Sequence, residues 1–212
     1  MKITILYDNK TFRQELKPDW GFSCLVEAYD RTILFDTGTD GSILLDNMEK
    51  MNIDPSVVEE VFISHAHFDH VGGLSSFLNE NSDVNIYVPP SLRGVHHGRE
   101  TIHVDQPMKL HEHFYSTGEI DQIEQSLVVQ TDKGLVVLVG CSHPMMNDIL
   151  STASQFGNIY GIVGGLHGFR EFELFRDLEL ICPTHCTQYI KEIKRLYPEK
   201  YVEGGAGRII EI

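Results

Sequence analysis

The sequence lacks the features that would place it among membrane, secreted or polyanion-binding proteins. None of its apolar runs reaches the roughly 18–20 residues that a membrane-spanning helix needs. Four cysteines in 212 residues are too few and too scattered for a disulfide-rich secreted scaffold. Lys and Arg number 17 against 31 Asp and Glu, and the resulting net charge of −14 disfavours nucleic acid as a partner.

Several catalytic motifs are absent as well. No Gly-x-Ser-x-Gly elbow, Walker loop or Rossmann fingerprint is present, which argues against a serine hydrolase, a P-loop enzyme or a dinucleotide-dependent enzyme. The segment Met1–Asp8 carries one basic residue and a short apolar stretch, so it predicts a first β-strand and no secretory signal. We therefore expect a cytoplasmic protein whose cysteines stay reduced.

The chain shows no linker, low-complexity segment or repeat, so a single domain over residues 1–212 is expected. Two strand-rich halves are each followed by helical patterns, which predicts an α/β protein with helices outside packed sheets. Val61–Ser64 and Val136–Gly140 are apolar runs of the kind found in strands buried on both faces. Residues 91–125 are less regular and contain five histidines, and we expect a loop-rich active-site flap there.

Histidine is the most informative residue type in this sequence. The stretch 64–70, Ser-His-Ala-His-Phe-Asp-His, contains three histidines and one aspartate within six residues, directly after a predicted buried strand. Imidazole nitrogen and carboxylate oxygen both suit first-row divalent cations. His65 and His67 can face one ion while Asp69 and His70 turn toward a second. A polar loop with incidental histidines is disfavoured because histidine is a rare residue.

Three more histidines follow predicted strands, and they are the candidate distant ligands: His143, His167 and His185. Any one of them alone could be a satisfied histidine near the core, but the recurrence at strand ends favours ligation. For His167, a metal contact and a substrate contact both remain open. The strand before His185 is expected over Leu180–Cys182, with Pro183 marking its end.

Two cysteines neighbour these histidines, Cys141 before His143 and Cys186 after His185. A thiolate contact with a metal is open, but small buried residues at strand ends are the interpretation we favour from the sequence.

The histidine cluster resembles a known signature. His65-x-His67-x-Asp69-His70 is similar to the motif of the metallo-β-lactamase superfamily, and Phe35-Asp36-Thr37-Gly38 resembles its upstream aspartate motif. The resemblance spans nearly the whole chain. Further stretches resemble the subgroup of dihydropterin-linked ribofuranosyl-aminobenzene phosphate synthase-like hydrolases: Gly72-Gly73-Leu74, Gly140-Cys141-Ser142-His143-Pro144, Gly164-Gly165-Leu166-His167 and Pro183-Thr184-His185-Cys186.

This resemblance implies a four-layer αββα sandwich with a dinuclear metal site in a cleft between the sheet edges. One ion would be held by His65, His67 and His143, and the other by Asp69, His70 and His185. Asp36 would orient a ligand histidine by hydrogen bonding. The chain departs from the pattern in one respect: no aspartate follows the strand after His143, and His167 is the ligand-type side chain near that position.

The implied function is a metal-dependent hydrolase that uses a metal-bound hydroxide on a small anionic substrate, with a phosphoester favoured. Asp69 would bind metal and also steer the nucleophile. Zinc is the favoured metal for the two sites, with manganese and iron left open. The alternatives are a lactonase or thioesterase and a non-catalytic metal- or ligand-binding sensor of the same fold. Di-iron redox chemistry is more distant. The sequence leaves the oligomeric state open.

Overall fold

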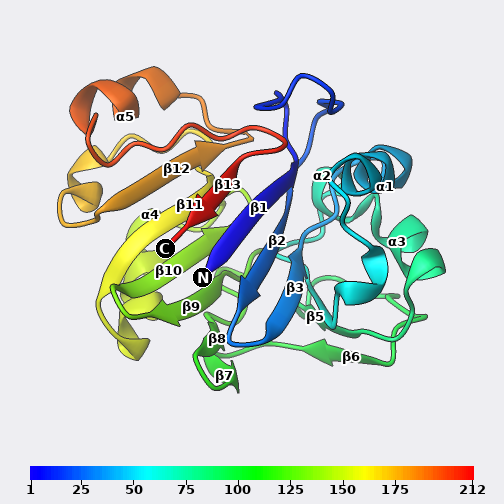
Figure 1. Cartoon of the computed structure of the whole chain (residues 1–212). Coiled ribbons are helices and arrows are strands. Elements are labelled where there is room, and N and C mark those ends of the chain that lie inside the picture. Colours follow the sequence, from blue (N-terminus) through cyan, green and yellow to red (C-terminus); the bar gives the residue numbers. More distant parts are fainter.

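The computed structural model describes residues 1–212 and contains two β-sheets that pack face to face (Figure 1). The first sheet has the strand order β13-β1-β2-β3-β4-β5-β6. Its strands are β1 (Lys2–Tyr7), β2 (Ser23–Ala28), β3 (Arg31–Phe35), β4 (Glu60–Phe62), β5 (Asn85–Val88), β6 (Glu100–His103) and β13 (Ile209–Glu211).

The second sheet has the strand order β12-β11-β10-β9-β8-β7. Its strands are β7 (Met108–His111), β8 (Phe114–Ser116), β9 (Leu127–Thr131), β10 (Gly134–Val139), β11 (Ile159–Gly165) and β12 (Leu180–Thr184). The α-helices are α1 (Gly41–Lys50), α2 (Phe68–Val71), α3 (Leu74–Glu80), α4 (Met146–Ala153) and α5 (Ile190–Leu196), and the 3-10 helices are η1 (Pro55–Val57), η2 (Ser154–Phe156) and η3 (Phe172–Phe175).

Three apolar layers hold these elements together. The central layer lies between the sheets and combines Phe35 and Phe62 of the first with Leu138 of the second. A second layer packs α1 and α3 on the outer face of the first sheet, and a third packs α4, α5 and η3 on the outer face of the second. Helices therefore cover both outer faces, as Figure 1 shows. The expectation of an αββα sandwich is confirmed, because each sheet buries both of its faces.

The expected end of one strand is wrong. β12 does not stop at Cys182 but continues through Pro183 to Thr184, and Pro183 is paired in register with Gly164 of β11. β12 is the edge strand of its sheet, and Ile181 donates its N–H outward to the carbonyl of Lys200. Because N–H groups two residues apart point to the same side of a strand, the missing N–H of Pro183 falls on this outer side.

Residues 91–125 contain three short strands, β6 at the edge of the first sheet and β7 and β8 at the edge of the second. The carboxylate of Glu60 links this region to the first sheet, since its Oε1 atom lies 2.5 Å from His111 Nε2. The role of the segment as an active-site flap stays a prediction.

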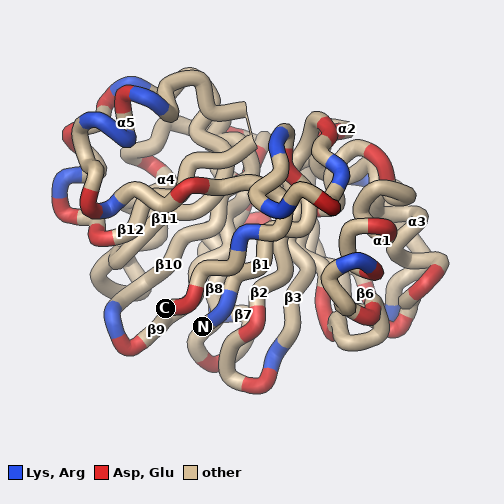
Figure 2. Tube along the Cα trace, turned by 45° about the horizontal axis from the view of Figure 1, so that its top comes forward, with Lys and Arg blue, Asp and Glu red and all other residues tan.

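Charged residues lie mainly on the helices and connecting turns, and the inner strands carry few of them (Figure 2). The two chain ends lie side by side, with the Met1 amino group donating to the carbonyl of Ile212 at 3.1 Å. None of the helices combines the length and the apolar character that crossing a membrane would require.

Candidate metal centre

The ends of four strands bring the predicted ligands to one edge of the sandwich. β4 leads into His65, β10 into His143, β11 into His167 and β12 into His185. β10, β11 and β12 are parallel, so their carboxyl ends emerge together. The topology therefore gathers residues that lie up to 120 positions apart in the sequence.

The first ligand group consists of His65, His67 and His143, whose potential ligand atoms all lie within 4.8 Å of one another. The Nε2 atom of His65 is 3.1 Å from Nδ1 of His67. His143 Nε2 is buried and has no hydrogen-bond partner. A buried imidazole nitrogen without a partner is costly, and a cation bound by these nitrogens would remove that cost.

The second ligand group consists of Asp69, His70, Cys141 and His185, again within 4.8 Å. His185 Nε2 lies 3.2 Å from Asp69 Oδ2 but is not aligned for a hydrogen bond, and it too is buried without a partner. His70 Nε2 lies 3.2 Å from the sulfur of Cys141. The sequence did not lead us to favour Cys141 as a ligand, but in the structure its sulfur is one of the potential ligand atoms of this group.

Asp36 contacts the ligand residues but belongs to neither ligand group. Its Oδ2 atom lies 2.7 Å from Nδ1 of His70, which leaves Nε2 of that ring facing the second group. Its Oδ1 atom accepts the Ser64 N–H at 2.7 Å, and the Ser64 hydroxyl lies 2.7 Å from Oδ2 and 2.9 Å from His65 Nδ1. One carboxylate thus orients a histidine of each group, directly for His70 and through Ser64 for His65.

His185 is oriented by a residue that the sequence did not single out. Asn9 Oδ1 lies 2.9 Å from His185 Nδ1, and the Asn9 amide donates to the His185 carbonyl at 2.8 Å. Asn9 follows β1, far away in the sequence, and a lone asparagine after a strand gives no recognisable signal.

Glu124 is the most important residue that sequence reasoning missed. Its Oε1 atom accepts the backbone N–H groups of Gly140, Cys141 and Ser142 at 2.9, 3.0 and 3.1 Å, and its Oε2 atom accepts that of His143 at 3.0 Å. Its side chain is buried. The carboxylate therefore fixes the loop that carries two ligands. Because its partners are backbone groups, no side-chain pattern could reveal it.

Trp20, the only tryptophan, lies at the mouth of the centre and is 56% exposed. Its indole Nε1 donates to Asp69 Oδ2 at 2.9 Å, and its ring meets that of His185 edge-on with centroids 5.0 Å apart. The contact holds the Asp69 carboxylate toward the ligand group while one side of the indole faces solvent.

The electrostatics of the centre favour metal-binding protonation states. Burial and the neighbouring imidazoles lower the pKa of His65 far below its usual range and that of His143 to about 4. Burial raises the pKa of Asp69, but the close imidazoles of His185 and His70 outweigh it and hold the pKa below its ordinary value. At neutral pH these side chains are neutral imidazoles and a carboxylate, the forms that bind divalent cations.

The donor set therefore fits the implied metals. It combines imidazole, carboxylate and sulfur donors with two unpartnered buried nitrogens that point inward. His167 lies outside both groups. It is exposed, and its ring centroid is 5.2 Å from that of His143.

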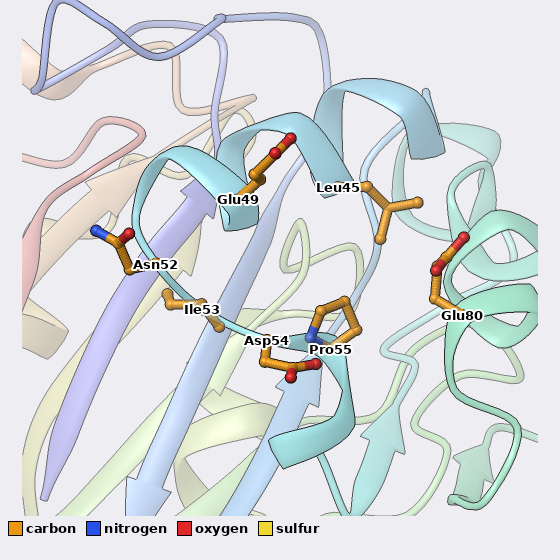
Figure 3. Close-up of a pocket in the computed structure, with 7 residues that line it drawn as sticks. All are labelled: Leu45, Glu49, Asn52, Ile53, Asp54, Pro55 and Glu80. Atoms are coloured by element: carbon orange, nitrogen blue, oxygen red, sulfur yellow. The ribbon is translucent and has the colours of Figure 1, made fainter.

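A hollow of about 390 Å³ adjoins the first group and is lined by His143, His167 and Arg170, among others. Its position beside a ligand histidine suits a substrate-binding space. A different hollow, of about 440 Å³, lies beside α1, η1 and α3 (Figure 3). It is lined by three carboxylates and no cationic side chain, and it shares no residue with the ligand groups, which disfavours it as an anion site.

The chain is similar to several known proteins. A family model described as the metallo-beta-lactamase superfamily matches residues 18–143. The chain is 26% identical, over 92% of its length, to 7,8-dihydropterin-6-methyl-4-(beta-D-ribofuranosyl)-aminobenzene-5'-phosphate synthase of Methanocaldococcus jannaschii, of which it covers 91%. It is 30% identical to ribonuclease Z of Streptococcus agalactiae serotype Ia over 56% of its own length and 39% of that protein.

A solved structure, that of a metal-dependent hydrolase of the beta-lactamase superfamily, is 24% identical and superimposes with a TM-score of 0.84, covering 100% of this chain and 99% of that one. This likeness shows the shared fold over the full length of the chain.

Proposed function

The chain belongs to the metallo-beta-lactamase superfamily, and we propose that it is a dinuclear metal-dependent hydrolase that acts on a small anionic phosphoester. The observation that carries the proposal is the division of the ligands into two adjacent groups, each with a buried imidazole nitrogen that lacks a partner. When bound, divalent cations at these ligands supply Lewis acidity and lower the pKa of water toward neutrality. We propose zinc, because a mixed nitrogen, oxygen and sulfur donor set suits it.

The residues of this chain have separate tasks in the proposed reaction. The low pKa of Asp69 keeps it ionised, and its Oδ2 atom is already an acceptor for the Trp20 indole. The free acceptor capacity of this carboxylate can orient an attacking water by hydrogen bonding. Asp36, Ser64 and Glu124 hold the ligands in place, so the site needs little rearrangement during the reaction.

Arg170 supports a phosphoester over a neutral substrate. It lines the hollow beside His143, where its guanidinium stacks on the Tyr189 ring, 4.5 Å from the ring centroid, and donates to the Tyr189 hydroxyl. A guanidinium held in this way is suited to bind phosphate oxygens. Arg170 is the one Lys or Arg side chain in the lining, which also includes Glu171, and it supplies the positive charge that an anion would meet there in a chain of net charge −14.

The relatives support the same substrate class. The archaeal relative is named for a product that bears a 5'-phosphate, and the streptococcal relative is a ribonuclease. Lactone or thioester hydrolysis is the competing reaction, since the same ligands could activate water against a carbonyl. A sensor without turnover also remains in competition, because no aspartate follows β11 at the position of the bridging ligand expected from the resemblance.

One experiment separates these functions. The zinc- or manganese-loaded protein is assayed with small phosphodiesters, phosphomonoesters, lactones and thioesters, together with the His67→Ala, Arg170→Ala and Arg176→Ala variants. We expect phosphoester turnover that His67→Ala abolishes. Arg170→Ala should raise the KM for the phosphoester about tenfold, because one charge-assisted contact is lost. Arg176 is exposed and lies outside the hollow, so Arg176→Ala should leave the KM unchanged.

Preferential turnover of lactones or thioesters, unaffected by Arg170→Ala, would assign the protein to the competing reaction. Two bound metal equivalents without turnover of any substrate would instead favour the sensor.

A further inference from the structure

A third cluster of ligand-type side chains shares Cys141 with the second ligand group and adds two residues, His167 and Cys186, that the proposed reaction does not use. Cys141, His167 and Cys186 form a third group whose potential ligand atoms lie within 4.8 Å of one another. They follow β10, β11 and β12, so the three parallel strands deliver one ligand-type side chain each. The group adjoins the second group through Cys141, whose sulfur also lies 3.2 Å from His70 Nε2.

The backbone leaves space for these sulfurs. A Cβ atom at Gly165 would lie 2.4 Å from the Gly140 carbonyl oxygen, 2.7 Å from Cys186 Sγ and 3.2 Å from the Cα atom of Cys141, so any other residue there would displace both the strand end and the Cys186 sulfur. The loop that carries Cys141 is itself fixed, because Glu124 accepts its N–H. The sulfur group is therefore a packed feature of the strand ends and does not depend on a flexible loop.

The other two cysteines of the chain are a useful contrast. Cys24 and Cys182 are buried in the apolar layer between the sheets, and neither belongs to a group of ligand-type side chains. Their environment is that of small hydrophobic residues, whereas Cys141 and Cys186 face a histidine at the surface of the metal centre. The sequence left a metal contact open for Cys141 and Cys186 but favoured small buried residues, and the structure places only these two of the four cysteines in a group of ligand-type side chains.

We propose that Cys141, His167 and Cys186 form a further metal site that takes a thiophilic divalent cation of the zinc class, shares the Cys141 sulfur with the second group and is separate from the group of His65, His67 and His143. Thiolate donors select soft and borderline metals over magnesium, calcium or manganese. Two cysteines and one histidine are also a ligand set with which zinc keeps its fourth position open. His167 thereby acts as a metal ligand and not as a substrate contact.

The test uses cobalt(II) as the probe, added to the reduced, metal-free, full-length protein. Thiolate ligation gives a near-ultraviolet sulfur-to-cobalt charge-transfer band, whereas imidazole and carboxylate ligands alone do not. We expect the band in the wild type, about half its intensity in Cys186→Ala, and none in the Cys141→Ala/Cys186→Ala double variant, because intensity follows the number of Co–S bonds. Cys182→Ala is the matched control and should keep the full band.

His167→Ala should retain the band but weaken cobalt binding at this site by about tenfold or more, because one of three ligands is lost. A wild-type protein that binds cobalt, shown by its visible bands, without the charge-transfer band overturns the proposal. An undiminished band in Cys186→Ala, as expected if Cys141 binds metal only with the second group, overturns it too, as does an undiminished band in the double variant.

A measurement on the wild type keeps the proposal falsifiable if the cysteine variants do not fold. Zinc should slow alkylation at Cys186, which is partly exposed, by at least about tenfold when the thiolate is a ligand. Equal alkylation with and without zinc, or a Cys141–Cys186 disulfide that persists in zinc-treated protein, overturns the proposal. The outcome is independent of the proposed hydrolysis: His67→Ala should lose turnover and keep the cobalt–sulfur band.

Discussion

Asp36 Oδ2 lies 2.7 Å from Nδ1 of His70, and both side chains are completely buried. Burial alone would lower the pKa of His70, but the charge and hydrogen bond of Asp36 raise it above the usual value. The carboxylate therefore presents the other ring nitrogen of His70 to the second ligand group and makes the ring more basic. This pair explains how a buried residue that binds no ion can still control metal affinity.

Replacing Asp36 with asparagine keeps the size of the side chain and removes its charge. We expect Asp36→Asn to weaken metal binding by about 10- to 100-fold, the usual cost of losing an acceptor behind a histidine ligand. Competition with a chromophoric chelator measures this change. Asp40→Asn, which alters the exposed N-cap of α1, is the control and should leave affinity unchanged. Equal affinities for the wild type and Asp36→Asn would show that the contact does not tune the ligand.

The contacts of Glu124 lead to a prediction about folding. Glu124→Ala would leave the N–H groups of Gly140, Cys141, Ser142 and His143 without their acceptor. We expect the free energy of unfolding of the metal-free protein to fall by roughly 3–5 kcal/mol, because buried donors would be stranded. Urea denaturation measures it, with the exposed Glu112→Ala as the control. A loss below about 1 kcal/mol would mean that water replaces the carboxylate without cost.

The parts of the site that could be predicted from the sequence are the metal-ligand side chains that cluster locally or follow a recognisable strand. The stretch 64–70 is compact enough to suggest a metal, and His143 and His185 could be found because each directly follows a strand with strong apolar character. The largely buried strands β1, β5 and β9 have the bounds that their apolar patterns predict, namely Lys2–Tyr7, Asn85–Val88 and Leu127–Thr131. The stretch 64–70 already suggests two ions, but the assignment of His143 to one group and His185 to the other came from the resemblance, since spacing alone does not bring distant strand ends together.

The parts that could not be predicted depend on backbone contacts and on tertiary position. Glu124 accepts hydrogen bonds from backbone N–H groups. Nearly every residue has such a group, so the residue types of its partners do not reveal the contact. The strands β6, β7 and β8 are three or four residues long and partly polar, so they lack the periodicity that identifies a strand. The sequence predicts a strand end at Pro183, because only the whole topology shows that this strand lies at a sheet edge, where a proline is tolerated.

Asp8 should make the stability of the metal-free protein depend on pH. Burial raises its pKa from 3.8 to about 6, despite the N–H groups of His185 and Lys10 that it accepts. Between these values the folded protein holds a proton that the unfolded chain has released. Stability therefore falls as pH rises from about 4 to about 6, by up to about 3 kcal/mol from this group.

The difference between the wild type and Asp8→Asn isolates this effect, since asparagine does not ionise. We expect the variant to gain stability relative to the wild type across that pH range, measured by urea denaturation in the presence of a chelator. The exposed Asp132→Asn should give a curve parallel to that of the wild type. A parallel curve for Asp8→Asn would mean that Asp8 ionises as readily in the folded protein as in the unfolded chain.

Gly140 follows β10 and lies against Ser64 and His65, which follow β4, so a substitution here tests how closely the two sheets must approach for the first ligand group to form. A Cβ atom at this position would lie 2.1 Å from the Ser64 hydroxyl oxygen and 2.9 Å from His65 Nδ1. Ser64 cannot easily move aside, because it is buried and holds Asp36 through both its backbone N–H and its hydroxyl. Gly140→Ala must therefore displace His65, or separate the two strand ends.

We expect Gly140→Ala to lower the free energy of unfolding by about 1–3 kcal/mol, the usual cost of overpacking, and to weaken metal binding at the histidine group more than at the sulfur group. Gly168→Ala is a matched control, because an added Cβ there meets nothing closer than 3.8 Å. Elemental analysis after dialysis, combined with the cobalt–sulfur band, separates the two groups. Retention of both metals by Gly140→Ala would show that His65 has more freedom than its contacts with Ser64 and His67 suggest.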